Sequence, residues 1–341
     1  MKLISYDVQT ALGTFTRIGA LVDEKIIDLN NSYTALLADS GEVNSAKRIA
    51  SGIIPPDMVM FLEGGKASLD AAKQTIEYAL HRLQKDPLSL GAHGQRLSFN
   101  EKEVVWLAPV PKPHMIRDGI LLLDHYKVGM ERLFKITGKD QIPEASKTMP
   151  IFWKPSRSAV GAHKQDIVWP KYSTKLDYEF ELGIYIGKRG KDITVENASE
   201  YIAGYTIFND LGLRDIQPAE LTLRMGPAKA KDFATSKIMG PYLVTPDEMG
   251  SVENLRLIIR VNHDTWFDGR LGNWAFTFEQ FIAYVSRDEF LEVGDFFGSG
   301  PPAYSAGFEI NKWIKPGDLL ECEIEGLGVL SNTIVQQKTT A

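Results

Sequence analysis

The chain has 341 residues, of which 44% are hydrophobic and 24% charged, and its formal net charge is −6. This length allows one large domain plus a smaller one, and the mild acidity without a basic stripe argues against a nucleic acid partner. The single cysteine, Cys322, excludes an intrachain disulfide framework and fits a reducing compartment. No apolar run approaches the roughly 18 residues that cross a bilayer, and the N-terminus lacks a secretory signal. We therefore expect no membrane partner and a cytoplasmic location.

The first hundred residues predict a small α+β domain. Alternating apolar residues separated by turns predict three strands at 2–8, 14–22 and 25–29. An apolar stripe opposite Lys and Glu residues predicts an amphipathic helix over 67–84. A polar, glycine-bearing link follows, and we place a domain boundary near residue 100, which gives domains at 1–100 and 101–341.

The remainder predicts many short strands and few helices. After the proline-rich segment 109–113, helical spacing runs over about 119–134, and a short amphipathic helix is expected at 277–285. Further strands are expected at 241–245 and 256–262, and two Gly-Asp turns introduce the C-terminal strands. This pattern is typical of a β-rich α+β domain.

The stretch 176–215 carries an unusual set of carboxylates. It opens with the period-two pattern of a strand, in which Asp177, Glu179 and Glu181 alternate with Tyr178, Phe180 and Leu182. A second apolar strand about thirty residues later ends in Asn209-Asp210. Carboxylates this close repel one another unless a cation lies between them, and oxygen ligands suit a hard divalent cation. The alternative is an acidic face that is simply solvated.

Several phrases in a fixed order resemble the fumarylacetoacetate hydrolase family over about residues 104–333. They are residues 177–182, 204–210 with 214–217, 240–245 and 324–328. The resemblance implies a β-rich catalytic fold of packed, rolled sheets with short flanking helices, and a divalent cation, with Mg²⁺ expected first and Mn²⁺ or Ca²⁺ as alternatives.

The resemblance also implies the ligands of that cation. Glu179, Glu181 and Asp210 occupy three ligand positions of the family. In the members closest to fumarylacetoacetase, a fourth ligand is an aspartate seven residues before the catalytic histidine, a spacing that Asp118 and His125 match. If this segment is helical, seven residues are two turns and both side chains face the same side. His125 can also be an ordinary histidine on a helix surface.

Other site residues follow from the same resemblance. Glu309 resembles the glutamate that orients the histidine, although it can equally be a solvent-facing residue at the start of a strand. Lys231 matches the lysine that polarises the substrate, and Thr235 follows it at the family spacing. The remaining matches are Arg214 and Gln217 beside the metal cavity and, by a looser alignment, Arg132 as a substrate carboxylate ligand. Arg214 with Asp215 can instead be a structural ion pair.

Three departures from the family pattern concern the substrate. Ile120 stands where fumarylacetoacetase has a substrate-binding tyrosine, and Asp124 replaces a usual glutamine. Ser299 lies in a glycine-rich phrase that replaces a Gly-Thr phrase, so a hydroxyl for the substrate carboxylate is missing or comes from Ser299. Trp153 and Trp274 are expected to line a more apolar pocket.

The resemblance implies a metal-dependent hydrolase that cleaves a carbon–carbon bond in a β-diketone or acylpyruvate-like small molecule, with His125 activating water. Decarboxylation of an oxaloacetate-like acid, and isomerisation or hydration of a dienoate, are the enzymatic alternatives. A degenerate member that only binds a metal or ligand is the non-enzymatic one. The family commonly forms homodimers, so a homodimer is expected.

Overall fold

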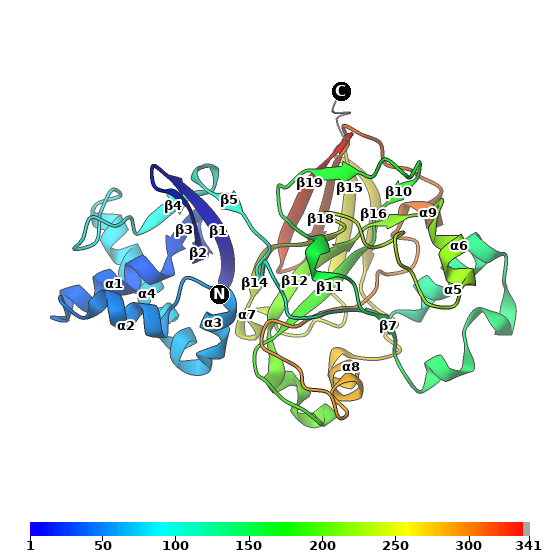
Figure 1. The fold of residues 1–341 in the computed structure, drawn as a ribbon, viewed down its shortest axis with the longest axis horizontal. Coiled ribbons are helices and arrows are strands. Elements are labelled where there is room, and N and C mark those ends of the chain that lie inside the picture. The colour runs from blue at the N-terminus through cyan, green and yellow to red at the C-terminus, as the bar shows by residue number, and fades with distance from the viewer. Residues whose placement is uncertain (337–341) are drawn as a thin grey trace.

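The computed structural model describes residues 1–336 and consists of a smaller N-terminal lobe joined to a larger lobe (Figure 1). The α-helices are α1 Leu29–Asp39, α2 Ala46–Ile53, α3 Met58–Glu63, α4 Gly65–Lys85, α5 Leu123–Phe134, α6 Gln217–Thr222, α7 Pro246–Met249, α8 Phe278–Val285 and α9 Gly307–Ile310. Within these residues, no helix combines the length and the apolar character that a membrane crossing requires.

The strands form one large sheet and two smaller ones. The large sheet has the order β4-β3-β2-β1-β14-β12-β11-β17-β6-β7, with β5 on β1 and β8 on β14; a second sheet has the order β16-β15-β18-β19-β9, and β10 pairs with β13. The strands are β1 Lys2–Thr10, β2 Gly13–Val22, β3 Lys25–Asp28, β4 Ser98–Asn100, β5 Val105–Trp106, β6 Ile116–Ile120, β7 Ile151–Trp153, β8 Val160–Ala162, β9 Ile167–Trp169, β10 Leu176–Asp177, β11 Phe180–Ile186, β12 Ile202–Asp210, β13 Gly212–Leu213, β14 Lys237–Val244, β15 Arg256–Val261, β16 Asp264–Arg270, β17 Phe296–Gly298, β18 Leu319–Ile324 and β19 Gly328–Gln336.

The N-terminal elements largely follow the sequence pattern. The three predicted strands are β1, β2 and β3, and the predicted helix is α4, whose buried stripe includes Ala72, Ala79 and Leu83. Helix α1 begins where the Asp28 carboxylate accepts a hydrogen bond from the Asn31 backbone N–H. Because β1 pairs with β14, the large sheet runs through both lobes, and a domain boundary near residue 100 stays a prediction.

The helix expected over 119–134 is shorter than the periodicity indicated. Residues up to Ile120 belong to β6, which pairs with β17 on one side and β7 on the other, and α5 begins only at Leu123. Pairing on both edges outweighs the local helical pattern. Asp118 and His125 therefore come from a strand and a helix, and not from two turns of one helix.

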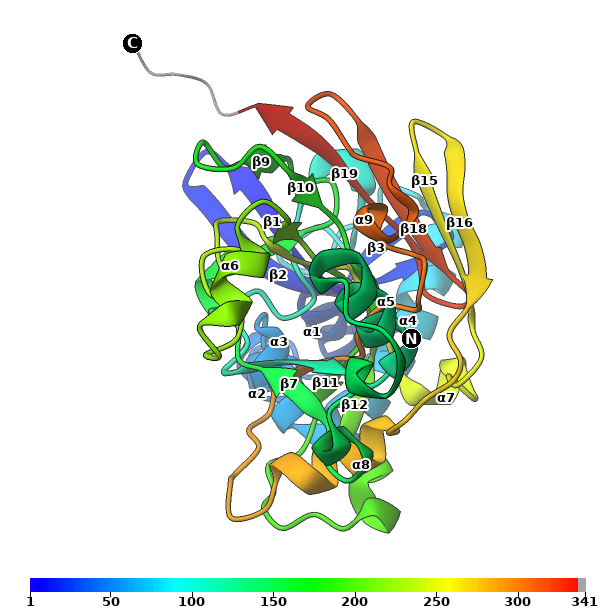
Figure 2. The ribbon, with the colours of Figure 1, turned by 90° about the vertical axis from the view of Figure 1, so that its right-hand side faces the viewer.

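The central strands bring the acidic residues together. The apolar side chains of Tyr178, Phe180 and Leu182 belong to the main hydrophobic core. The neighbouring strands β12, β11, β17 and β6 then bring Asp210, Glu181 and Asp118 to one place in the sheet. Helices α5 and α6 lie at the side of the larger lobe that is away from the N-terminal lobe (Figure 1), and they face the viewer in Figure 2.

Candidate active site

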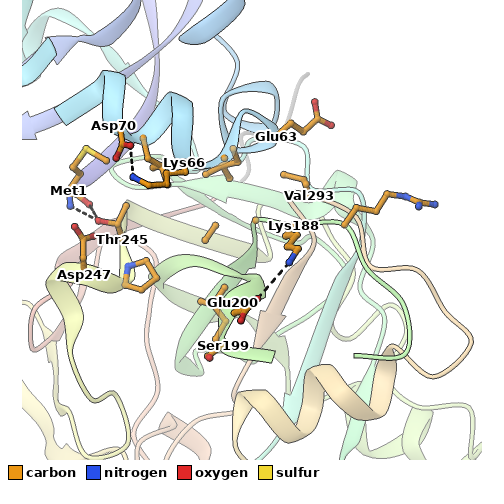
Figure 3. A pocket seen from close by; sticks show the side chains of 18 of the residues that line it. Met1, Glu63, Lys66, Asp70, Lys188, Ser199, Glu200, Thr245, Asp247 and Val293 are labelled. Carbon is orange, nitrogen blue, oxygen red and sulfur yellow. Dashed lines mark hydrogen bonds and ion pairs between the residues drawn. The ribbon is translucent and has the colours of Figure 1, made fainter. Parts of the chain in front are cut away.

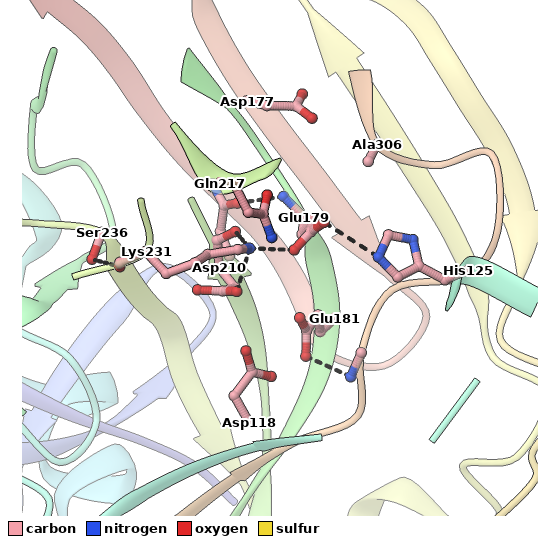
Figure 4. Close-up of polar contacts among 12 residues, drawn as sticks. Asp118, His125, Asp177, Glu179, Glu181, Asp210, Gln217, Lys231, Ser236 and Ala306 are labelled. Atoms are coloured by element: carbon pink, nitrogen blue, oxygen red, sulfur yellow. Dashed lines mark hydrogen bonds and ion pairs between the residues drawn. The ribbon is translucent and has the colours of Figure 1, made fainter. Parts of the chain in front are cut away.

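Three buried carboxylates converge at the centre of the large sheet. Asp118, Glu181 and Asp210 each offer an oxygen atom, and these atoms all lie within 4.8 Å of one another (Figure 4). Gly298 of β17 leaves the room for them, because a Cβ at this position would lie 2.8 Å from Asp118 Oδ1 and 2.8 Å from Glu181 Oε2. The acidic face of the strand is thus buried, and the solvated alternative is wrong.

This cluster fits a hard divalent cation. Burial, followed by repulsion from neighbouring carboxylates, raises the pKa of Asp118 and of Glu181 well above the usual range. Asp118 Oδ1 is buried and lacks a hydrogen-bond partner among the described residues. A cation bound to these oxygens would remove both penalties, and an all-oxygen set suits Mg²⁺, Mn²⁺ or Ca²⁺.

The balance of buried charges around the three carboxylates also favours a bound divalent cation. Four buried basic groups face six buried carboxylates, which leaves two negative charges when His125 is counted as charged and every carboxylate as ionised. A divalent cation would neutralise this remainder. The basic groups are His125, Arg214, Lys231 and Lys237, and the carboxylates are Asp118, Asp177, Glu179, Glu181, Asp210 and Glu309.

Glu179, the remaining predicted ligand, is held by basic side chains. Its carboxylate contacts Arg214 and Lys231, and Lys231 Nζ also contacts the Asp210 carboxylate. Burial by itself would raise the pKa of Glu179, but the two cations outweigh it and hold that pKa well below its usual value. Arg214 also pairs with Asp177, with Nε 2.8 Å from Oδ2, so its carboxylate partners are Asp177 and Glu179. Asp215 instead accepts hydrogen bonds from Ser173 and Thr174.

His125 lies between two carboxylates in the first turn of α5. Its Nδ1 is 3.0 Å from Glu309 Oε1, and its Nε2 is 3.3 Å from Glu179 Oε1. Burial lowers the pKa of His125, but Glu309 and Glu179 outweigh it and raise this pKa to about 9. In the metal-free protein, the two carboxylates therefore favour the protonated imidazole.

Glu309 is fixed by the local fold. It lies fully buried in the short helix α9, and its Oε2 accepts a hydrogen bond of 3.0 Å from the Ala306 backbone N–H. The alternative of a solvent-facing glutamate at a strand start is wrong. Because Glu309 is anchored to the backbone, it can hold the orientation of His125.

The sequence did not predict two polar contacts of this network, those of Lys237 and Trp153 with the carboxylates. Lys237, at the start of β14, is fully buried, and its Nζ contacts Asp210 and donates to the Lys231 carbonyl oxygen over 2.6 Å. Trp153 Nε1 donates to Asp118 Oδ2 over 2.9 Å. The sequence signal for Lys237 is a lysine at the head of an otherwise apolar strand.

A cavity of about 290 Å³ opens beside the carboxylates. Most of the predicted site residues line this cavity, and so does Trp153. They are Asp118, Ile120, His125, Glu179, Glu181, Asp210, Arg214, Gln217 and Lys231. Other predicted residues lie outside its lining: Arg132 is exposed, Thr235 is half-buried, and the buried Ser299 donates to the Gly300 carbonyl oxygen. The expectation for Trp274 is wrong, because this side chain packs on Phe278 and donates to the Glu253 carbonyl oxygen.

A larger cavity of about 790 Å³ lies between the lobes (Figure 3). Most of its charged side chains pair with each other, as Lys66 does with Asp70 and Lys188 with Glu200. This leaves the smaller cavity, with its convergent buried charges, as the candidate active site.

Comparison with known proteins supports this assignment. The sequence pattern of the family described as "Fumarylacetoacetate (FAA) hydrolase C-terminal" matches residues 126–335. The human protein "Oxaloacetate tautomerase FAHD2A, mitochondrial" is 31% identical over 83% of this chain and 81% of its own length. "Oxaloacetate tautomerase YisK" of Bacillus subtilis (strain 168) is 30% identical over 93% of this chain and 95% of its own length.

A solved structure shares the fold. The maleylpyruvate hydrolase from Sphingobium sp. SYK-6, in complex with manganese(II) ion and pyruvate, superposes with a TM-score of 0.67 at 19% identity, covering 99% of this chain and 100% of that one. This similarity confirms the expected β-rich α+β fold.

Proposed function

Because this chain belongs to the fumarylacetoacetate hydrolase family, we propose that it is an enzyme that interconverts the keto and enol forms of a 2-oxo acid. The observation that carries the proposal is the position of His125, which lies between Glu309 and Glu179 in the same pocket as the three converging carboxylates. The tautomerases among its relatives support this reaction. The alternatives that the sequence indicated, decarboxylation of an oxaloacetate-like acid and isomerisation or hydration of a dienoate, did not include it.

A divalent cation fits the site formed by Asp118, Glu181 and Asp210, with Glu179 as the further ligand that the sequence predicts. When bound, such a cation polarises the oxygen atoms of a 2-oxo acid and so acidifies the neighbouring C–H bond. Mg²⁺ stays the expected ion, and the manganese-bound neighbour makes Mn²⁺ an equal candidate for assays.

His125 supplies the proton transfer. In the enol-to-keto direction, its Nε2 proton passes to the substrate carbon, the enol hydroxyl proton leaves to solvent, and solvent reprotonates the ring. Glu309 at Nδ1 keeps Nε2 directed into the pocket. Lys231 Nζ, beside Glu179 and Asp210, stabilises negative charge on the substrate oxygen.

Hydrolysis of a carbon–carbon bond is the second candidate, and the intact His125–Glu309 pair favours it. In that reaction His125 takes a proton from water, and the water oxygen then attacks a carbonyl carbon. We place tautomerisation first because the relatives named as tautomerases are 31% and 30% identical to this chain, whereas the maleylpyruvate hydrolase is 19% identical.

The test follows the enol absorbance of 2-oxo acids together with pyruvate release, with Mg²⁺ or Mn²⁺ and with chelator. We expect cation-dependent loss of enol without pyruvate, and a rate reduced at least about a hundredfold in His125→Asn. His263→Asn is the matched control, because that side chain is 81% exposed. Pyruvate released together with a second carboxylic acid and without carbon dioxide would indicate hydrolysis. Pyruvate released together with carbon dioxide would indicate decarboxylation, and binding without turnover would indicate a degenerate member.

A homodimer and a cytoplasmic location stay predictions. Light scattering measures the first directly, and a mass of one chain in solution would contradict it. For the second, the name of the human relative places that protein in mitochondria, so the compartment of this chain requires its own measurement.

A further inference from the structure

The cavity beside the carboxylates has a second, apolar end. One face of α5 lines it with Tyr126, Met130, Leu133 and Phe134, whose spacing of three and four residues places them on one side of the helix. The lining also includes Ile151 of β7 and Leu221 of α6. The cavity therefore continues from the charged groups into a space lined mainly by aliphatic and aromatic side chains.

These apolar side chains lack a partner in the protein core. All six are only half-buried, and within residues 1–336 none belongs to a hydrophobic core cluster. Several apolar side chains around one cavity leave apolar surface in water, which a ligand would remove. The position of this wall at the reaction centre makes a substrate the occupant.

The charges of the cavity argue against a second carboxylate on that substrate. Besides His125, the cationic groups among its described lining residues are Arg214 and Lys231, and both lie at the charged end, against Glu179. Arg132, the residue expected to hold a distal carboxylate, is exposed and outside the lining. A carboxylate placed against Met130 and Leu133 would lose its hydration without gaining a partner.

Gly129 affects the width of the cavity. It lies within α5, where glycine costs about 1 kcal/mol relative to alanine. A Cβ at this position meets only Phe308 Cζ, at 4.0 Å. Gly129 therefore keeps the cavity open where a side chain would narrow it. Along the helix axis, His125 and Phe134 are about 13.5 Å apart, so the lining residues of α5 extend about that far from the histidine.

We propose that the substrate is a 2-oxo acid whose far end is an apolar group, an alkyl chain or an aromatic ring, that binds against α5, β7 and Leu221. This inference rests on the proposed function for the 2-oxo acid head and adds the class of its tail. It separates this chain from its relatives, whose names specify a dicarboxylate, oxaloacetate.

The test measures binding, so that it does not depend on turnover. Three inert oxamates share one head and differ in the nitrogen substituent, which is hexyl, benzyl or carboxymethyl, and their dissociation constants are measured by calorimetry with Mn²⁺ present. We expect the hexyl or benzyl compound to bind at least about tenfold more tightly than the carboxymethyl compound. Equal or tighter binding of the carboxymethyl compound, or no binding of the apolar ones, would overturn the proposal.

Two glycine variants locate the tail. Gly129→Leu fills the apolar end and is expected to abolish the preference for the apolar substituents. Gly52→Leu in α2 is the matched control, since a Cβ added to that exposed helical glycine would have nothing within 4 Å, and the residue lies outside the cavity lining. A preference that persists in Gly129→Leu would contradict the proposal. If the binding preference holds while no 2-oxo acid is converted, the proposed reaction fails and the assignment of the tail stands.

Discussion

The two ends of the active-site cavity differ in how their side chains are held. At the charged end, His125, Glu179 and Lys231 are buried and contact one another or further charged groups. At the apolar end, Met130 and Leu133 are half-buried and lie outside the core clusters. A change at the charged end disturbs a whole network, whereas a change at the apolar end alters one wall. We therefore expect the first to control turnover and the second to control the choice of substrate.

The largest effect is expected from breaking the carboxylate cluster. Glu181→Gln removes one negative charge from three converging ligands, so cation affinity should fall, and the rate should fall at least about a thousandfold. Calorimetric titration with Mn²⁺ and the enol assay measure the two quantities. Glu200→Gln, at a side chain that is 65% exposed, is the matched control. Unchanged Mn²⁺ affinity in Glu181→Gln would refute the ligand role.

A somewhat smaller effect is expected from Glu309→Gln. The amide retains the size of the side chain but loses the negative charge that orients His125 and stabilises its protonated form. We therefore expect kcat to fall about a hundredfold, with cation affinity retained. Steady-state kinetics measure kcat, and calorimetry on the same preparation measures the cation affinity. A loss of cation affinity equal to that of Glu181→Gln would show that Glu309 acts on the cluster instead.

The two buried histidines should affect stability in opposite pH ranges. In metal-free protein, the pKa of His125 is raised to about 9, so its contribution is fully present below about pH 6.5 and is lost as the pH rises through 9. Burial, with a smaller effect of Lys164, lowers the pKa of His163 to about 3, so its contribution is present above about pH 6.5 and is lost as the pH falls toward 3.

The measurement is the free energy of unfolding against pH, with chelator, for wild type, His125→Asn and His163→Asn. The difference between wild type and His125→Asn should shrink above pH 7 by up to about 3 kcal/mol. The difference for His163→Asn should shrink below pH 6. Parallel curves for all three proteins would contradict both assignments.

The smallest effects on activity are expected at two residues that the sequence predicted as substrate contacts but that lie outside the cavity lining. Arg132→Gln and Thr235→Ser alter an exposed and a half-buried side chain outside the lining, so kcat/KM should change less than about twofold. The enol assay measures this, with Ile120→Ala as the comparison from within the lining. A tenfold loss in Arg132→Gln would restore it as a carboxylate ligand.

Much of the N-terminal lobe could be predicted from the sequence, because the stripe of α4 is a local pattern. The alternation along 176–182 grouped the carboxylates correctly, but it indicated one strand where the structure has β10 and β11 with Tyr178 and Glu179 between them. The partners of those carboxylates are not local. Glu309 approaches His125 across 184 residues, and Lys237 reaches Asp210 only through the pairing of β12 with β14. The strand β6 was hidden for the same reason, since its two edges are satisfied by β17 and β7.

In the proposed reaction, His125 transfers a proton at the carbon next to the carbonyl of a 2-oxo acid. Deuterium incorporation at that carbon in D₂O, followed by proton NMR with Mg²⁺ present, measures this step itself. We expect enzyme-dependent exchange that stops with chelator and falls about a hundredfold in His125→Asn. Carbon–carbon cleavage without prior exchange, or exchange unchanged in His125→Asn, would contradict it.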